Sequence, residues 1–351
     1  MFERGKRRKK MRKRRRKRMK DDLKVTHFNE SKINSRMTGI KRYEDELYNH
    51  LSEHINITRI MRGTSRYKDN MVASWLFRYK TNTDLVHATS QTIAPVVYFR
   101  KFKRFIVTVH DVIPLFYPQT INDISKRIQW QLIPRALHKV DRIIAVSNYV
   151  KEHDLVEVIG IPEDKITVIY GGIDHDRFKP MDRDECKLCF NLDRNKKHIL
   201  SIMSTFDIKG FEPYKRQDVA NKVINQVYRC RDDVAVTYLG EKYIPDHLLP
   251  LFYNCFDVLL YPSEYTTFEF PVLEAMACGV PVVCLNTGSN PEIVGNSGGL
   301  VDDIDDIDQF VEATLKLLDK PKPDSKCVEQ VRKFSWDKTA KQTLKLYEEM
   351  L

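Results

Sequence analysis

The sequence contains no apolar run of the roughly 18 to 20 residues that a membrane-spanning helix requires. Its basic start also lacks the apolar stretch of a secretory signal peptide. The seven cysteines are odd in number and scattered, which is typical of a protein kept in a reducing compartment. We therefore expect a cytoplasmic protein without disulfides, which at most associates peripherally with a membrane.

An excess of positive charge is confined to the start of the chain. The formal net charge is +11, yet residues 1–18 alone hold thirteen Lys or Arg and a single acid. The remainder is close to neutral, so no basic face is predicted for it. Such a charge block cannot bury a core, and we expect residues 1–20 to form a disordered arm, unless Met19 is the natural start. An anionic membrane surface is the partner favoured for residues 4–20, ahead of nucleic acid.

Beyond the arm, short apolar runs alternate with helical patterns, which is typical of βα units and a parallel sheet. The first series has predicted strands at 23–28, 84–88, 104–109, 142–146 and 166–169. After a turn-rich stretch at 170–180, a second series has predicted strands at 198–203, 234–239, 257–262 and 281–286. We therefore predict an α/β fold with two Rossmann-like domains facing across a cleft, the second of them reduced. Ligands of such sheets bind at the carboxyl ends of the strands.

The strongest local signal lies between residues 257 and 303. Pro271 is predicted to begin a helix, where its missing N–H costs little, and Glu274 is expected in the first turn. A helix start attracts anions, and the carboxylate of Glu274 can accept two hydrogen bonds from a vicinal diol such as ribose. Gly279 and Pro281 end this helix before the next buried strand.

This segment resembles the donor-site signature of the family-4 (group 1) retaining glycosyltransferases, which have the GT-B fold. Further segments along the chain also match the family, in the family's order, at 38–47, 105–118, 143–154, 165–180 and 334–351. The resemblance implies transfer of a hexose from a nucleoside diphosphate sugar to a hydroxyl of a glycan, a lipid-linked glycan or a protein glycan. It also implies an acceptor domain at 21–178, a sugar-nucleotide domain at 179–335, and a closing helix at 336–351 that packs back on the first domain.

The resemblance also assigns roles to individual residues. Glu274 is implied to bind the ribose hydroxyls, His110 to lie near the transferring sugar, and Lys215 to neutralise the diphosphate as it leaves. These three are the predicted catalytic residues. The predicted donor-binding residues are Gly39, Asp111, Lys209, Arg216, Thr266, Glu269, Phe270, Pro271, Val272 and Leu273.

No metal and no organic cofactor are predicted. No Asp-x-Asp element stands at a strand end in the required place, and Lys215 can replace Mg²⁺. Cys186 and Cys189 have a CxxC spacing, but two further zinc ligands are not nearby in the sequence. The acidic string at 302–306 precedes a helical pattern, so we expect it to cap that helix.

Two positions depart from the family pattern. Thr266 stands where the first signature glutamate is expected, so Glu264 or Glu269 would have to replace it, and Thr205 stands where an arginine is usual. An alternative hypothesis is therefore a catalytically degenerate GT-B protein that acts as a binding module and is recruited by its basic arm to a membrane or nucleic acid. A GT-B sugar-nucleotide epimerase is disfavoured, because the linker and the closing helix match the transferases.

Overall fold

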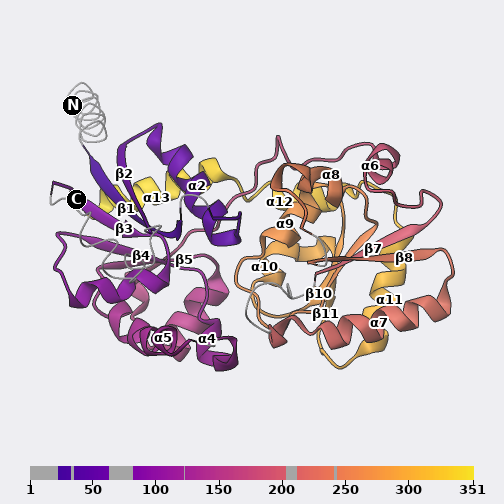
Figure 1. Ribbon diagram of the computed structural model, residues 1–351, viewed down its shortest axis with the longest axis horizontal. Helices are drawn as coiled ribbons and strands as arrows, with labels where there is room; N and C mark the ends of the chain where they lie inside the picture. Colours follow the sequence, from indigo (N-terminus) through magenta and orange to yellow (C-terminus); the bar gives the residue numbers. More distant parts are fainter. Residues whose placement is uncertain (1–22, 33–34, 63–81, 122, 203–211, 241–242) are drawn as a thin grey trace, which may run out of the picture.

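The computed structural model describes residues 23–32, 35–62, 82–121, 123–202, 212–240 and 243–351. They form two α/β domains, each built around a parallel sheet, which lie next to each other along the longest axis of the molecule (Figure 1). The prediction of two Rossmann-like domains is confirmed. The basic arm lies outside the described residues.

The first sheet has six strands in the order β2-β1-β3-β4-β5-β6, all of them parallel. The strands are β1 (Lys24–Lys32), β2 (Asn56–Arg62), β3 (Leu85–Ala88), β4 (Phe105–Val109), β5 (Arg142–Ala145) and β6 (Ile166–Val168). Each predicted strand of the first series corresponds to one of these. The additional strand, β2, lies at the edge of the sheet and is only partly buried, so it lacks the apolar run by which the others were recognised.

Helices α2 (Gly39–Ser52) and α5 (Ile124–Leu137), together with η1 (Gln91–Tyr98) and η3 (Val150–Val158), cover the first sheet. Thr38 caps α2, because its hydroxyl accepts a hydrogen bond from the backbone N–H of Lys41. Helix α5 packs on η1 and buries its last turn, while Ile124 and Ile128 on its first turns are 75% and 54% exposed. A short helix α4 (Ile113–Phe116) follows β4.

The second sheet has five strands in the order β11-β10-β9-β7-β8, and is therefore smaller than the first. The strands are β7 (Lys197–Ile202), β8 (Val234–Leu239), β9 (Val258–Tyr261), β10 (Val282–Leu285) and β11 (Gly299–Val301). The surrounding helices are α6 (Arg183–Cys189), α7 (Gln217–Cys230), α8 (Leu249–Tyr253), α9 (Phe270–Ala277), α10 (Asn290–Val294), α11 (Ile307–Leu318) and α12 (Ser325–Val331). Asp306 caps α11 by accepting from the N–H of Gln309, so the capping role expected of the acidic string is confirmed.

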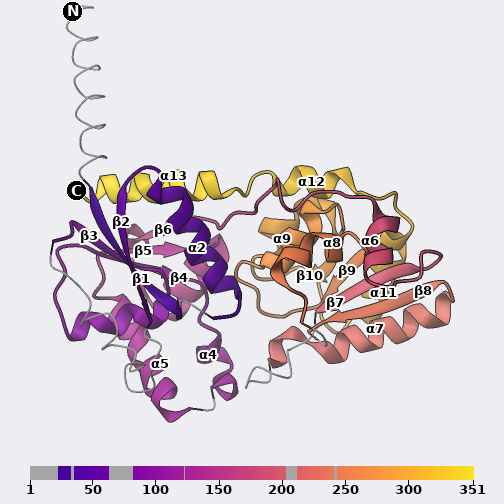
Figure 2. The same cartoon turned by 45° about the horizontal axis from the view of Figure 1, so that its top comes forward.

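Helix α13 (Trp336–Glu349) leaves the second domain and lies along the first, next to α2 (Figure 2). The hydroxyl of Tyr347 is hydrogen-bonded to Nε2 of His27 at 3.0 Å and to Nδ1 of His87 at 2.6 Å. Burial lowers the pKa of His27 to about 3 and that of His87 well below its usual value, so both rings are neutral at pH 7. This buried polar cluster fixes the end of α13 against the first sheet.

All seven cysteines are free thiols, and Cys186 and Cys189 lie on α6 with the first buried and the second exposed. In the part of the chain that the structure describes, no helix is both long and apolar enough to cross a membrane.

Candidate functional site

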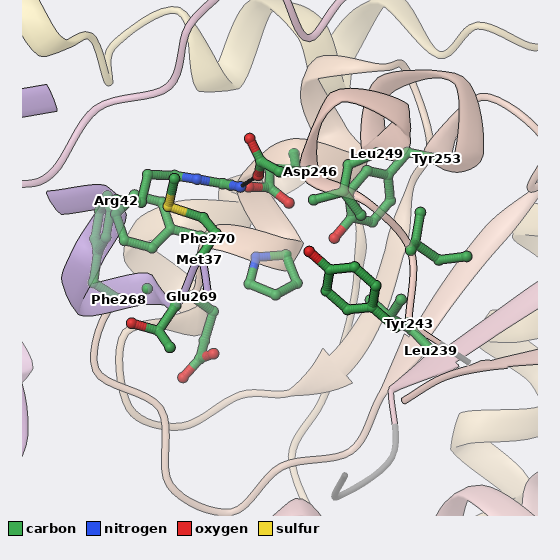
Figure 3. Close-up of a pocket in the computed structure, with 15 residues that line it drawn as sticks. Met37, Arg42, Leu239, Tyr243, Asp246, Leu249, Tyr253, Phe268, Glu269 and Phe270 are labelled. Atoms are coloured by element: carbon green, nitrogen blue, oxygen red, sulfur yellow. Dashed lines mark hydrogen bonds and ion pairs between the residues drawn. The ribbon is translucent and has the colours of Figure 1, made fainter. Parts of the chain in front are cut away.

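A cavity of about 320 Å³ lies between the two domains (Figure 3). Its first-domain wall is the start of α2, with Met37, Thr38, Gly39 and Arg42. Its second-domain wall consists of Leu239, Tyr243, Ile244, Asp246, Leu249, Tyr253, Phe268, Glu269, Phe270, Pro271 and Glu274. Leu239 is the last residue of β8, so the cavity lies at the carboxyl end of the second sheet, where ligands of doubly wound sheets bind.

Glu274 is a buried carboxylate in this cavity, with a side chain that is 2% exposed. Helix α9 begins at Phe270, so Pro271 is its second residue and Glu274 its fifth. The expectation that Glu274 lies in the first turn was wrong by one residue, and its own N–H is not among the helix's free donors. Gly279, with a φ of +78°, follows the end of the helix, as expected.

Arg42 of the first domain reaches across the cavity to Glu274. One nitrogen of its guanidinium pairs with Oε1 of Glu274 and another with Oδ1 of Asp246. Figure 3 shows the side chain of Arg42 extended toward Asp246. Asp246 has a second cationic partner, because Arg177 lies 2.7 Å from its Oδ2. The buried charge of Glu274 is thus balanced by a cation from the other domain.

The sequence analysis did not identify Arg42, Asp246 or Arg177 as site residues. Asp246 lies 204 residues beyond Arg42, and no local pattern links two residues so far apart. A weaker signal was present on α2 itself, since Arg42 follows Gly39 by three residues and therefore lies on the same face of the helix.

Gly39 brings the start of α2 close to α9. A Cβ atom at this position would lie 3.4 Å from Cδ2 of Phe270, a residue that also lines the cavity. The small residue therefore leaves the space between the two helices open on the side that faces the cavity.

His110 and Asp111 follow β4 and are not part of the cavity wall. Nε2 of His110 donates to the carbonyl of Thr89 at 2.8 Å, and its ring packs edge-on against Tyr43. Burial lowers the pKa of His110 to about 4, so the ring is neutral and its Nδ1 is an acceptor. Burial, together with the nearby carboxylates of Glu30 and Asp154, raises the pKa of Asp111 to about 7.

Two of the predicted cations of the second domain form ion pairs and do not line the cavity. Lys215 pairs with Glu212 at 2.7 Å, and its charge also opposes the rise that burial causes in the pKa of Glu269. Arg216 pairs with Asp218 at 3.0 Å and with Glu264. Lys209 and Thr205 lie outside the described residues.

Thr266, where the sequence differs from the family pattern, holds a neighbouring loop rather than facing the cavity. Its side chain is buried, and its Oγ1 donates to the carbonyl of Thr287 at 3.3 Å and accepts from the N–H of Ser289 at 3.2 Å. A Cβ at Gly288, where φ is +60°, would lie 2.3 Å from this Oγ1. Thr266 therefore stabilises the loop around Gly288 and does not line the cavity.

The remaining predicted donor-binding residues divide into two groups. Glu269, Phe270 and Pro271 line the cavity. The side chains of Val272 and Leu273 point into the hydrophobic core of the second domain, away from the cavity wall. Among the described residues, no group of three or more His, Cys, Asp or Glu is placed to hold a metal ion.

Two protein-family models match adjoining parts of the chain. Residues 41–177 match Glycosyltransferase Family 4, and residues 197–320 match Glycosyl transferases group 1. The O-antigen chain mannosyltransferase B of Escherichia coli is 26% identical over 277 residues, which cover 70% of this chain and 71% of that protein. The D-inositol 3-phosphate glycosyltransferase of Mycolicibacterium smegmatis is 27% identical over 241 residues, which cover 61% of this chain and 54% of that protein.

Solved structures with the same fold cover nearly the whole chain. Sucrose-phosphate synthase from Thermosynechococcus elongatus has a TM-score of 0.69 and 16% identity, covering 93% of this chain and 99% of that one. Anabaena Alr3699/HepE in complex with UDP-glucose has a TM-score of 0.67 and 16% identity, covering 93% and 100%. At this level of identity the likeness establishes the fold alone.

Proposed function

This chain belongs to the group 1 glycosyltransferases with the GT-B fold, and from that premise we propose that its interdomain cavity binds a nucleoside diphosphate sugar. The observation that supports this most directly is the position of Glu274. It is a buried carboxylate in a cavity to which both domains contribute. A ribose diol could satisfy both of its oxygens with charge-assisted hydrogen bonds.

We propose further that the hexose is transferred to a hydroxyl group with retention at the anomeric carbon. Negative charge grows on the leaving nucleoside diphosphate as the glycosidic bond breaks, so nearby cations lower the barrier. Protein side chains supply these cations in the proposed mechanism, without a metal. His110 is neutral at pH 7, and its free Nδ1 can accept a hydrogen bond from the sugar or the acceptor.

The proposed acceptor is a hydroxyl of a glycan or a lipid-linked glycan. One relative is by name an O-antigen chain mannosyltransferase, which supports an acceptor of this kind. On the exposed start of α5, Ile124 and Ile128 lie next to Lys126 and Arg127. An apolar strip beside cations suits a peripheral contact with an anionic membrane, where lipid-linked acceptors are found.

The experiment that tests the function is product analysis with the full chain. Nucleoside diphosphate hexoses that differ in base and sugar are offered with lipid-linked and soluble glycan acceptors, and release of the nucleoside diphosphate is followed. The linkage of the product is then read from its anomeric NMR signals. Release that depends on an acceptor, together with a retained anomeric configuration, supports the proposal. An inverted product would overturn the stereochemical part, and no binding of any nucleotide would overturn the whole.

A catalytically degenerate binding protein is the second candidate, and the specific observation in its favour is Thr266. A threonine stands where the carboxylate is expected, and its buried side chain is hydrogen-bonded to the neighbouring loop. Glu269 is the carboxylate nearest in the chain that lines the cavity, and it is the proposed replacement. Nucleotide binding without transfer in the same assay would favour the degenerate protein.

A further inference from the structure

Of the described residues that line the interdomain cavity, Arg42 alone carries a positive charge. Three carboxylates line the same cavity, those of Asp246, Glu269 and Glu274. A donor diphosphate would enter an environment with an excess of negative charge, which opposes binding unless a cation is free to meet it.

The described cations near the cavity differ in the location of their ion-pair partners. Lys215 and Arg216 are held by acidic residues of their own domain, Glu212 for the first and Asp218 and Glu264 for the second. Among the described residues, the acidic partners of Arg42 are Glu274 and Asp246, which lie across the cavity. Its planar guanidinium can bind two phosphate oxygens at once.

We propose that Arg42 is a donor-contacting residue with two alternative sets of partners. One set is the pair seen in the structure, Glu274 and Asp246. When the donor binds, the ribose hydroxyls take over Glu274, and the released guanidinium moves to the diphosphate. This inference rests on the proposed function, because it takes Glu274 as the ribose-binding residue.

The exchange leaves no buried charge without a partner. Asp246 keeps Arg177 at 2.7 Å after Arg42 departs, and Glu274 gains two hydroxyl donors. Arg42 lies in the first turns of α2, after Gly39, so the positive end of the helix dipole adds to its charge at the same cavity wall. The two states therefore differ in which anion Arg42 pairs with.

The test compares nucleosides with their diphosphates in the full chain. Dissociation constants of uridine, UDP, guanosine and GDP are measured by calorimetry for the wild type and for Arg42→Gln. The ratio of diphosphate affinity to nucleoside affinity isolates the phosphate contact, because breaking the pair with Glu274 affects both ligands equally. We expect this ratio to fall by about tenfold or more in Arg42→Gln, the loss typical of a charge-assisted hydrogen bond. The nucleoside itself should bind as well or more tightly.

Arg332→Gln is the control, since it removes an exposed arginine that lies outside the cavity and pairs with Glu329. Its ratio should equal that of the wild type. Arg42→Lys keeps the charge without the planar guanidinium and should reduce the ratio by a few-fold. If Arg42→Gln does not fold, the Arg42→Lys variant tests the inference. An unchanged ratio in the folded Arg42 variants would overturn this inference alone. A wild type that binds no nucleoside diphosphate would instead overturn the proposed function on which it rests.

Discussion

Tyr265 of the second domain donates its hydroxyl to Oδ2 of Asp154 in the first domain at a distance of 2.5 Å. The same hydroxyl accepts from the N–H of Val112 at 3.1 Å. A second link is formed by Glu292, whose carboxylate accepts from the N–H groups of Asn148 and Tyr149, both at 2.9 Å. Directional polar contacts thus link the two domains, and the contribution of Tyr265 can be tested on its own.

Replacing Tyr265 with Phe should destabilise the protein and loosen the link between its domains. Asp154 is fully buried, so it would lose one of its hydrogen-bond donors without gaining water, and the N–H of Val112 would lose its acceptor. The expected loss in the free energy of unfolding is about 1 to 3 kcal/mol, measured by urea titration. Tyr228→Phe, at a half-exposed position on α7, serves as the control. A Tyr265→Phe protein as stable as the control would show that this contact contributes nothing.

Glu274→Gln should weaken nucleotide binding while leaving the fold intact. The amide keeps the size of the side chain but has one acceptor oxygen, so one of the proposed bonds to ribose is lost or weakened. We expect about tenfold weaker binding of ribonucleotides, as for a lost charge-assisted hydrogen bond, and a smaller loss for the 2′-deoxy form. Calorimetry measures both, with Glu163→Gln, an exposed carboxylate outside the cavity, as the control. Equal losses for the ribo- and deoxyribonucleotide would argue against contact with the diol.

The features that could be predicted from the sequence are those that a local pattern of residues marks. The buried strands were recognised by their apolar runs, and Gly39 and Glu274 by short motifs. The strand β11, Gly299–Val301, was missed because it begins with glycine and carries no apolar run, and β2 because it is a partly buried edge strand. The pairing of Arg42 with Glu274 depends on how two separately folded sheets face each other. No periodicity within either segment encodes that relationship, so it required the structure.

The stability of the protein should depend on pH through Asp111. Burial, with the nearby charges of Glu30 and Asp154, raises the pKa of Asp111 to about 7, above its value in the unfolded chain. The folded state therefore binds the proton more tightly, and the stability that this proton contributes below pH 4 is lost as the pH rises through 7. Asp111→Asn cannot lose a proton, so its stability should fall less between pH 5 and 8.

The comparison uses urea unfolding of the wild type and of Asp111→Asn at these two pH values. Asparagine can still accept from the N–H of Ile113, which the native carboxylate contacts at 3.1 Å, so the fold should be kept. The wild type should lose about 1 kcal/mol or more relative to the variant over this range. Parallel pH dependences in the two proteins would show that Asp111 does not titrate there.

Deleting residues 1–18 should abolish binding to anionic lipid vesicles without affecting nucleotide binding. These residues hold thirteen of the 59 Lys and Arg of the chain, and the remainder of the sequence is close to neutral. Electrostatic attraction to an anionic surface is short-ranged in salt, so binding by the full chain should weaken steeply as ionic strength rises. Vesicle sedimentation with and without phosphatidylserine measures this, and a full-length protein with Gln at the thirteen positions separates charge from length. If the truncated and full chains bind anionic vesicles equally, membrane contact must come from the folded part, for which the exposed start of α5 with Ile124 and Ile128 is the surface to mutate next.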